Sequence, residues 1–319
     1  MTADAQNPIF NDEDKAREAL EAVRWPNGPV CPHCGNVDQD QLAKVEGKKR
    51  SHRPGLWYCN ECKGQFTVTV GTVFERSKIP LSKWWLATHL LNSSKKGMSA
   101  HQMHRMLGVT YKTAWFMLHR IREAMREEGL APLGGGGGIV EADETYFGKP
   151  ANPSPSVHRR GKPYLKRKQR WNSRPILALV ERGGRVRTFH VPVTDKASVQ
   201  KIVRENIAKE SRLHTDESNL YKGTDQVFAA HETVKHSVGE YVRDDIHTNS
   251  AEGYFSIFKR GMRGVYQHCA EKHLHRYLAE FDFRYNNRVA LGVNDGERAA
   301  LAMKGIEGKR LTYRRTNEA

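Results

Sequence analysis

The fold is decided by a stretch near the middle of the chain, Ile139-Val140-Glu141-Ala142-Asp143-Glu144-Thr145-Tyr146-Phe147. Its β-branched and aromatic residues predict a strand. Further strands are predicted at 176–180 and 186–193 around a Gly183-Gly184 hairpin turn, and a short one at 212–215. Helical spacing covers about 196–209, 250–263 and 271–288. Strands first, then alternation with helices, indicate a mixed α/β sheet domain.

Three acids within this region are candidates for one site. Asp143 ends a strongly apolar strand, and Asp216 ends the short strand, so we expect two acids at strand ends that can face one crevice. Glu252 begins a helix face that also carries Lys259, because seven residues advance nearly two whole turns. The opposite face carries a stripe of apolar residues that we expect to be buried, Phe255, Phe258 and Met262.

Three carboxylates at one place suit phosphoryl transfer. Two divalent ions about 4 Å apart can supply an activated oxygen nucleophile and stabilise the leaving 3′ oxygen. Hard oxygen ligands favour Mg²⁺ or Mn²⁺, and Lys259 could meet a phosphate. Each acid also has a structural reading: Asp143 as a solvated strand-end acid, Asp216 as a helix cap, and Glu252 as part of a capping box with Asn249. His214 and His247 stand beside the acids, and contact with phosphate is one of several roles open to them.

Four of the five cysteines form two CxxC pairs, Cys31 with Cys34 and Cys59 with Cys62. Four thiolates would close the tetrahedral shell of one zinc ion and leave no position for a catalytic water, so we expect a structural zinc in a small β-rich module. Free cysteines or a redox pair are the alternative. His33 and His52 are possible replacement ligands, but we expect both to face solvent.

Upstream of these strands the spacing predicts helices over about 9–24, with Asn11 as cap, over 81–92, and over 99–128. The last range is broken by Gly108 and has the outline of a helix-turn-helix. Its second helix would offer Thr110, Tyr111, Lys112, Thr113 and Arg120 to DNA, with His119 and Arg122 nearby. A helix pair that only packs is the competing interpretation.

The charge balance also points to nucleic acid. The 319 residues include 52 Lys or Arg against 36 Asp or Glu, a formal net charge of +16, which attracts phosphate backbones. The segment 156–174 alone holds eight basic residues, among them Arg167, Lys168 and Arg170, with Tyr164 and Trp171 between them. We expect an exposed loop that grips target DNA by charge and stacking, and a loop that is merely solvated is the alternative.

Composition excludes a membrane protein, because no apolar run approaches the ~18 residues of a spanning helix. The amino end carries no secretory pattern, and we expect a cytoplasmic protein. Five successive glycines, 134–138, predict a flexible joint between a front and a back half.

Several blocks resemble bacterial insertion-sequence transposases of the Asp-Asp-Glu superfamily, in the fifteen-ninety-five (ISXO-two-like) branch. The similar blocks are 24–35, 78–85, 138–149, 214–217 and 247–261, and they are distributed along most of the range 20–290. The resemblance implies an RNase H-like catalytic fold preceded by a zinc ribbon and a helix-turn-helix. It also implies two catalytic divalent ions and recognition of terminal inverted repeats, followed by DNA cleavage and strand transfer into target DNA.

Some members of the resembled family are described with Asn at the third ligand position, so Asn249 is an alternative to Glu252. We favour Glu252, because a carboxylate binds a divalent cation better than an amide does. The resemblance further implies a homo-oligomer on double-stranded DNA, and a bacterial, nucleoid-associated protein. The expected division is 1–76 (first helix and ribbon), 77–133 (helix-turn-helix), 139–295 (catalytic) and 296–319 (tail).

Two other functions fit parts of the pattern. A zinc-ribbon regulator would bind DNA without catalysis, and an RNase H-like nuclease would cleave without joining.

Overall fold

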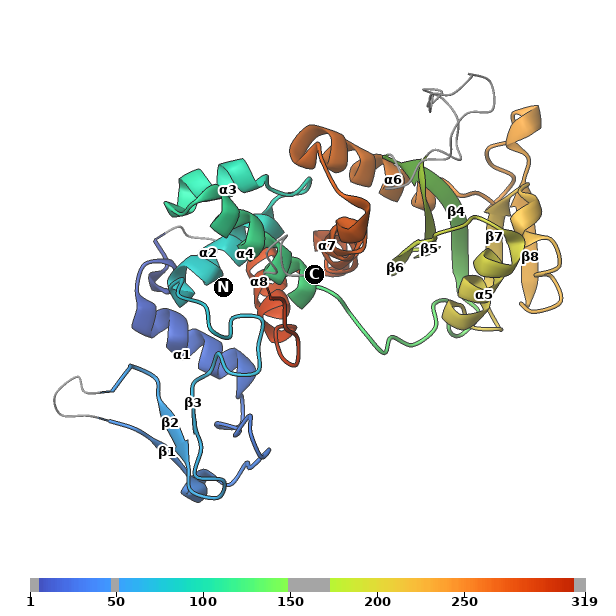
Figure 1. Ribbon diagram of the computed structural model, residues 1–319. Coiled ribbons are helices and arrows are strands. Elements are labelled where there is room, and N and C mark those ends of the chain that lie inside the picture. The colour runs from blue at the N-terminus through green and yellow to red at the C-terminus, as the bar shows by residue number, and fades with distance from the viewer. Residues whose placement is uncertain (1–5, 47–51, 149–172, 313–319) are drawn as a thin grey trace, which may run out of the picture. The chain divides into compact units, whose positions relative to one another are not determined.

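The computed structural model describes residues 6–46, 52–148 and 173–312. The chain forms two compact units (Figure 1). Unit 1 combines residues 1–126 with 287–319, and unit 2 comprises residues 127–286. The chain therefore passes from one unit to the other twice.

Unit 2 is built on a five-stranded sheet in the order β6-β5-β4-β7-β8. Its strands are β4 (Ile139–Phe147), β5 (Arg174–Glu181), β6 (Val186–His190), β7 (Arg212–Asp216) and β8 (Ala230–Val234). The first three pair antiparallel, whereas β7 and β8 extend the sheet in parallel from β4. The predicted mixed α/β sheet of RNase H-like type is confirmed.

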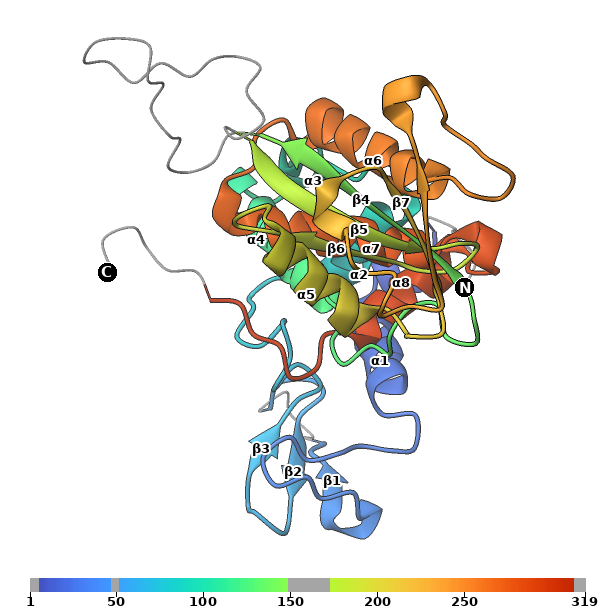
Figure 2. The same ribbon diagram turned by 90° about the vertical axis from the view of Figure 1, so that its right-hand side faces the viewer.

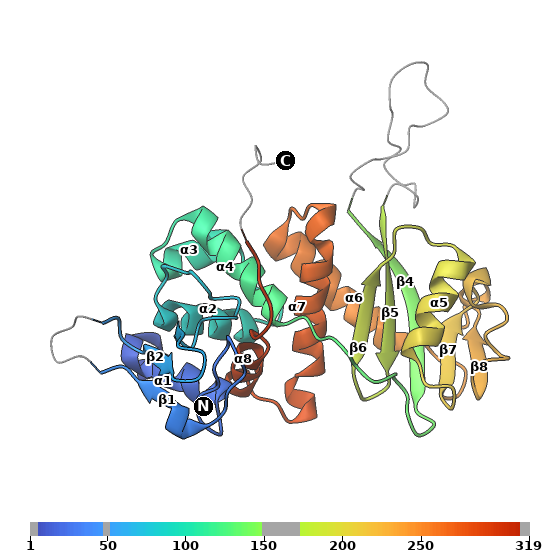
Figure 3. The same cartoon turned by 60° about the horizontal axis from the view of Figure 1, so that its bottom comes forward.

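Helices cover both faces of this sheet, as Figures 2 and 3 show. On one face, α5 (Lys196–Asn206) packs through Val199 and Val203 on Val140, Ala142 and Leu213. On the other face, α6 (Asn249–Gly261) and α7 (Leu274–Asn286) pack on Ile176, Ala178 and Val180. Because strand side chains alternate, the neighbours of Val140 and Ala142, which are Glu141 and Asp143, point to the α6 side.

The helices of unit 1 pack around large buried side chains, among them Leu20, Trp84, Trp85 and Met117. These helices are α1 (Glu13–Arg24), α2 (Leu81–Ser93), α3 (Ala100–Leu107), α4 (Tyr111–Ala124) and α8 (Asp295–Lys304). The cap of α1 is Asp12, which accepts from the N–H groups of Asp14 and Lys15, so the prediction of Asn11 was wrong by one residue. Glu13 in turn accepts from the N–H groups of Leu81 and Ser82 at the start of α2.

The first unit also holds a three-stranded antiparallel ribbon, β1 (Leu42–Lys44), β2 (Trp57–Cys59) and β3 (Gln65–Phe66). Trp25 packs edge-on against Trp57 and Phe66, with ring centroids 6.1 and 5.9 Å away. Arg24 donates to the carbonyls of Val68 and Val70 at 2.7 and 2.9 Å. The ribbon is thus tied to the end of α1 by both apolar and polar contacts.

Two segments differ from the expected organisation. The glycine run 134–138 lies inside unit 2, where the N–H of Gly134 donates to Glu181 and its carbonyl accepts from Ser211, so the run is held in place rather than acting as a free joint. The segment 296–319, expected as a tail, contains most of α8, which packs on α2 and buries Ala302 and Met303. None of the helices in the described parts of the chain combines the length and the apolar character that crossing a membrane requires.

Candidate active site

One cleft of about 470 Å³ in unit 2 collects the three candidate acids. Its walls are formed by β4, by the end of β7 with the residues that follow it, by His236, and by the face of α6 that carries Glu252 and Lys259. Asp143, Asp216, Glu252 and Lys259 all line it, together with Glu144. Asn249 is not among the lining residues. The cleft therefore joins residues that stand more than a hundred positions apart.

Strand register explains why the two aspartates face each other. In the parallel pair β4 and β7, Glu141 lies opposite His214. Asp143 and Asp216 come two residues later on their strands, so their side chains point to the same face as Glu141 and His214. Asp216 ends β7 as predicted, but Asp143 lies in the middle of β4 and not at a strand end. The carboxylate of Asp216 also accepts from the N–H of Ser218 at 3.0 Å, which is a local turn and not a helix cap.

The cleft gathers several acidic side chains with few positive charges to balance them. Burial and, after it, the negative charges of Asp216 and Glu252 together raise the pKa of Asp143 to about 7, against the opposing effects of the Glu144 N–H and of Lys259. Burial likewise raises the pKa of Glu144 to about 7, although the buried Tyr221 hydroxyl donates to it. Burial lowers the pKa of Lys259, and so does Arg263.

The three acids share the cleft without forming one tight cluster. In residues 6–46, 52–148 and 173–312, the four cysteines are the one group of three or more possible ligands whose ligand atoms all lie within 4.8 Å of one another. A single ion contacted directly by all three acids would need them closer together.

Glu252 lies in the first turn of α6, with its side chain exposed at the cleft. The apolar stripe on the opposite face is buried as predicted, with Phe255, Phe258 and Met262 each at most 4% exposed. The proposed capping box is absent: Thr248 is the N-cap, makes no side-chain cap hydrogen bond, and Asn249 is already helical. A residue of β4 caps the start of α6 instead.

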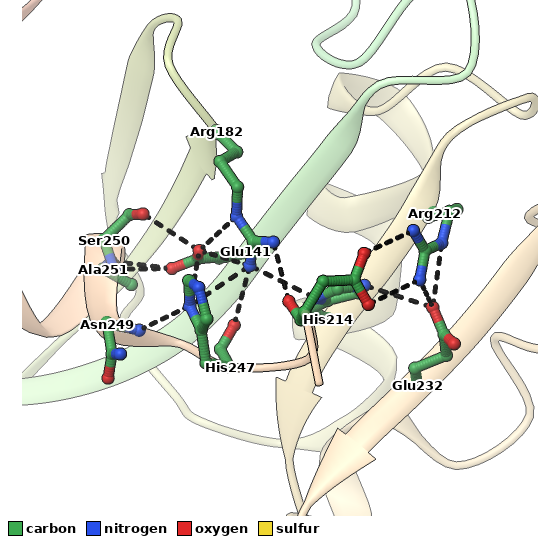
Figure 4. Close-up of polar contacts among 10 residues, drawn as sticks. Glu141, Arg182, Arg212, His214, Glu232, His247, Asn249, Ser250 and Ala251 are labelled. Atoms are coloured by element: carbon green, nitrogen blue, oxygen red, sulfur yellow. Dashed lines mark hydrogen bonds and ion pairs between the residues drawn. The ribbon is translucent and has the colours of Figure 1, made fainter. Parts of the chain in front are cut away.

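That cap is Glu141, a fully buried acid of β4 that sequence reasoning missed. Its carboxylate accepts from the N–H groups of Ser250 and Ala251 at 2.7 and 3.1 Å, and from the Ser250 hydroxyl at 2.9 Å. Arg182 donates to the same carboxylate through Nε and Nη2 at 3.1 and 2.9 Å (Figure 4). One signal was readable: Glu141 stands two positions before Asp143 on the same predicted strand, and therefore on the same face.

The two histidines beside the acids, His214 and His247, both contact Arg182. Nδ1 of His214 lies 3.3 Å from Arg182 Nη2, and its Nε2 lies 3.1 Å from Glu232. Because Arg182 can only donate, Nδ1 accepts and Nε2–H donates, which is the neutral ring. Burial and the charge of Arg182 lower the pKa of His214, in agreement with that form. Nδ1 of His247 lies 3.1 Å from Arg182 Nη2 and 3.2 Å from Glu141.

The four predicted zinc ligands come together at one end of the ribbon. Sγ of Cys31 lies 3.7 Å from that of Cys62, and Sγ of Cys34 lies 3.7 Å from that of Cys59. His33 instead donates to the carbonyl of Gln65 at 3.2 Å, and His52 is exposed. Four thiolates at this spacing fit tetrahedral zinc, which supports a structural zinc site. Cys269 is far along the sequence and donates to the carbonyl of Ala270.

The predicted helix pair is present, but its candidate DNA-contacting residues differ in how exposed they are. Gly108 makes the left-handed turn after α3, and Thr110 caps α4 by accepting from the Thr113 N–H. Tyr111, 43% exposed, stacks on His101 at 4.3 Å, and Lys112 is exposed. Arg120, in contrast, packs over the ring of Phe116 and donates to the carbonyls of Leu311 and Glu75.

Two expected neighbours of this surface are buried. His119 and Arg122 are each 1% exposed, so they lie in the interior behind the exposed start of α4 and not on its surface. They lie on the face of α4 that also carries the buried Leu118 and Ile121, and their polar groups are enclosed within unit 1. The basic residues Arg167, Lys168 and Arg170 lie outside the described residues.

Residues 135–286 match the model of the ISXO2-like transposase domain, and residues 11–65 match that of the transposase zinc-ribbon domain. A protein described as an uncharacterized protein in transposable element ISH50, from Halobacterium salinarum, is 28% identical over 289 residues. That alignment spans 86% of this chain and 91% of the relative.

Solved structures give much weaker likeness. The pre-cleavage Mos1 transpososome is 11% identical with a TM-score of 0.27, over 68% of this chain and 73% of that one. The Mos1 strand transfer complex is 12% identical with a TM-score of 0.29, over 70% and 75%. The two family models, however, span more than half of the chain between them, and the chain belongs to the ISXO2-like transposase family and is a DNA transposase.

Proposed function

We propose that the cleft of unit 2 cleaves DNA at the ends of an insertion sequence and joins the freed 3′ ends to target DNA, with Asp143, Asp216 and Glu252 holding two divalent ions. The observation that carries this is the convergence of three acids from β4, β7 and α6 on one cleft with few compensating cations. Burial and the repulsion of the neighbouring carboxylates raise the pKa of Asp143 to about 7, and a bound divalent cation would remove that repulsion.

The ions would be Mg²⁺ or Mn²⁺, because every candidate ligand is an oxygen atom. When bound, they would activate the attacking oxygen and stabilise the leaving one. Asp143 and Asp216 project from neighbouring strands, which are rigid elements, and so fix the ions relative to the sheet. Lys259 lines the same cleft two turns along α6 from Glu252 and would orient a phosphate. Asn249, which lies outside the cleft lining, would not be a ligand.

Unit 1 would recognise the terminal inverted repeats. Tyr111 and Lys112 stand exposed at the start of α4, where a recognition helix meets base edges or phosphates. Thr110 and Thr113 are engaged with each other at 2.9 Å and would contribute mainly through phosphate contacts. Arg120 no longer belongs to this surface, since it is bonded within the unit. Arg167, Lys168 and Arg170 would grip target DNA, and the active form would be a homo-oligomer on DNA in a bacterial nucleoid.

The test uses precut end oligonucleotides, a supercoiled target plasmid, and Mg²⁺ or Mn²⁺. The native protein should form joined products, whereas Asp143→Asn, Asp216→Asn and Glu252→Gln should lose joining by at least about 10³-fold, while end binding persists. Asn249→Ala is the matched control and should join normally. Binding without joining would favour the regulator, and cleavage without joining would favour the nuclease.

A further inference from the structure

A buried polar network lies beneath the acidic cleft, and each of its parts adjoins one candidate acid. Glu141 precedes Asp143 by two residues on β4, and His214 precedes Asp216 by two residues on β7. Ala251, whose N–H donates to Glu141, directly precedes Glu252 on α6. Arg182 links these parts through Glu141, His214 and the carbonyl of His247 (Figure 4).

The bonding of Glu141 exceeds what solvation of a buried carboxylate requires. It accepts from Arg182 twice, from the Ser250 hydroxyl, and from the N–H groups at the second and third positions of α6. An anion at those two N–H groups is the arrangement of a helix cap, and the helix dipole favours it. Here the capping residue lies on β4, 109 positions away in the sequence. It therefore fixes the start of α6 to the sheet.

The network extends outward from Arg182 to the edge of the sheet. Nη1 of Arg182 donates to the carbonyl of Asp245 at 2.7 Å. Arg212 of β7 bonds Glu232 of β8 at 2.7 Å and Asp245 at 2.7 Å. The segment 245–251, which leads into α6, is therefore tied to β7 and β8 as well as to β4. All three elements that carry the acids are connected by one set of charge-assisted bonds.

We propose that Glu141 and Arg182 are positioning residues that hold the first turn of α6, and hence Glu252, in register with Asp143 and Asp216. The inference rests on the proposed function, because it concerns the geometry of the same metal site. Ligands of a metal centre must be held to within about 0.5 Å, and loss of a group that orients them commonly costs 10–100-fold in metal affinity.

The experiment measures Mn²⁺ binding to the full-length protein without DNA, by the electron paramagnetic resonance of free Mn²⁺. Glu141→Gln should bind Mn²⁺ about 10–100-fold more weakly than the native protein. The Mn²⁺ concentration that half-saturates strand transfer should rise by a similar factor, and excess Mn²⁺ should restore joining. Asp143→Asn should lose the binding, and excess Mn²⁺ should not restore its activity.

A matched control separates positioning from general stability. Glu280 is also fully buried in unit 2, where it pairs with Arg284 and accepts from Tyr266, but it does not line the cleft. Glu280→Gln should destabilise the fold and leave Mn²⁺ affinity unchanged. Arg182→Lys, which keeps the charge and loses the forked contact, is the second variant should Glu141→Gln not fold, and should weaken Mn²⁺ binding in the same direction.

The outcomes distinguish the two proposals. If the native protein shows no Mn²⁺ binding that Asp143→Asn removes, the proposed metal site itself is wrong. If that binding exists but folded Glu141→Gln and Arg182→Lys retain native affinity, the positioning role is overturned. Equal losses of affinity in Glu141→Gln and Glu280→Gln at equal loss of stability would also overturn it.

Discussion

Buried carboxylates in unit 2 fall into two kinds according to their partners. Glu141 is fully buried yet bonded to a guanidinium, a hydroxyl and two backbone N–H groups, so its charge is compensated within the protein. Asp143, two residues away, has other acids as its neighbours, and its pKa is raised. A compensated acid stabilises an arrangement, whereas an undercompensated one is available to a cation.

Asp282 offers a test of this distinction away from the cleft. It is buried on α7 and accepts from Tyr254 at 2.6 Å and from the N–H and hydroxyl of Thr188, but burial still raises its pKa to about 7. Between pH of about 4 and 7 the folded state keeps a proton that the unfolded state has lost. The contribution of Asp282 to the free energy of unfolding should therefore decrease as pH rises through that window, by at most about 4 kcal/mol.

Asp282→Asn cannot titrate and should lack this decrease. We expect the free energy of unfolding of the native protein, minus that of Asp282→Asn, to fall between about pH 4 and 7. Pulse proteolysis in urea, with residues 127–286 quantified by mass spectrometry, measures it for unit 2. Thr188→Val keeps the carboxyl and should keep the pH dependence. A difference that does not change with pH would contradict the assignment.

For single residues, the sequence predicted those side chains whose residue type alone indicates metal binding. Four cysteines in two pairs and acids at Asp143, Asp216 and Glu252 are visible in the chain itself. Glu141 was missed because a cap is normally sought next to its helix, and this one comes from another strand. Its role depends on the pairing of β4 with β7 and the packing of α6, which no local pattern contains.

Elements with strong local patterns were also predicted well. The bounds of β4 match the prediction, and α2, α5 and α6 begin within one residue of it. The strand β8, Ala230-His231-Glu232-Thr233-Val234, was missed because three of its five residues are polar and no apolar alternation marks it. Its identity as a strand comes from pairing with β7, where Glu232 meets Arg212.

The ribbon is the element that depends most on a metal, because its strands are only two or three residues long. A strong chelator should remove about one zinc per chain and unfold residues 31–66. Trp25 and Trp57 would then leave their edge-on contact, so tryptophan fluorescence should shift to the red. Protease protection of residues 127–286 should not change, since unit 2 is a separate unit.

Zinc content provides the control for this prediction. Cys59→Ser should lose the metal, because it removes one of the four clustered thiolates. Cys269→Ser should retain it, since that cysteine lies in the other unit. Native zinc content in Cys59→Ser would show that the cluster is not the zinc site.

At the scale of the whole molecule, the division of the chain was the hardest feature to predict. A glycine run normally suggests a linker, but here Glu181 and Ser211 bind its backbone within unit 2. The return of the chain to unit 1 after Asn286 has no compositional mark. One signal was available: the capping box of Asn294 and Glu297 predicts the start of a helix, which is α8.

The return of the chain predicts that unit 1 needs the C-terminal segment to fold. Ala299, Ala302, Met303 and Ile306 are each at most 3% exposed, and the N–H of Val73 donates to the carbonyl of Ile306 at 3.1 Å. A chain that ends at Asn294 should lose these contacts, at a cost of about 2–5 kcal/mol for each large buried side chain. Limited proteolysis should then cut within residues 6–126 while residues 127–286 persist, and binding to element ends should be lost. A chain that ends at residue 312 is the control and should behave as the full-length protein. Were the chain ending at Asn294 to keep unit 1 protected, α8 would be an accessory helix, and the expected division with an independent tail would stand.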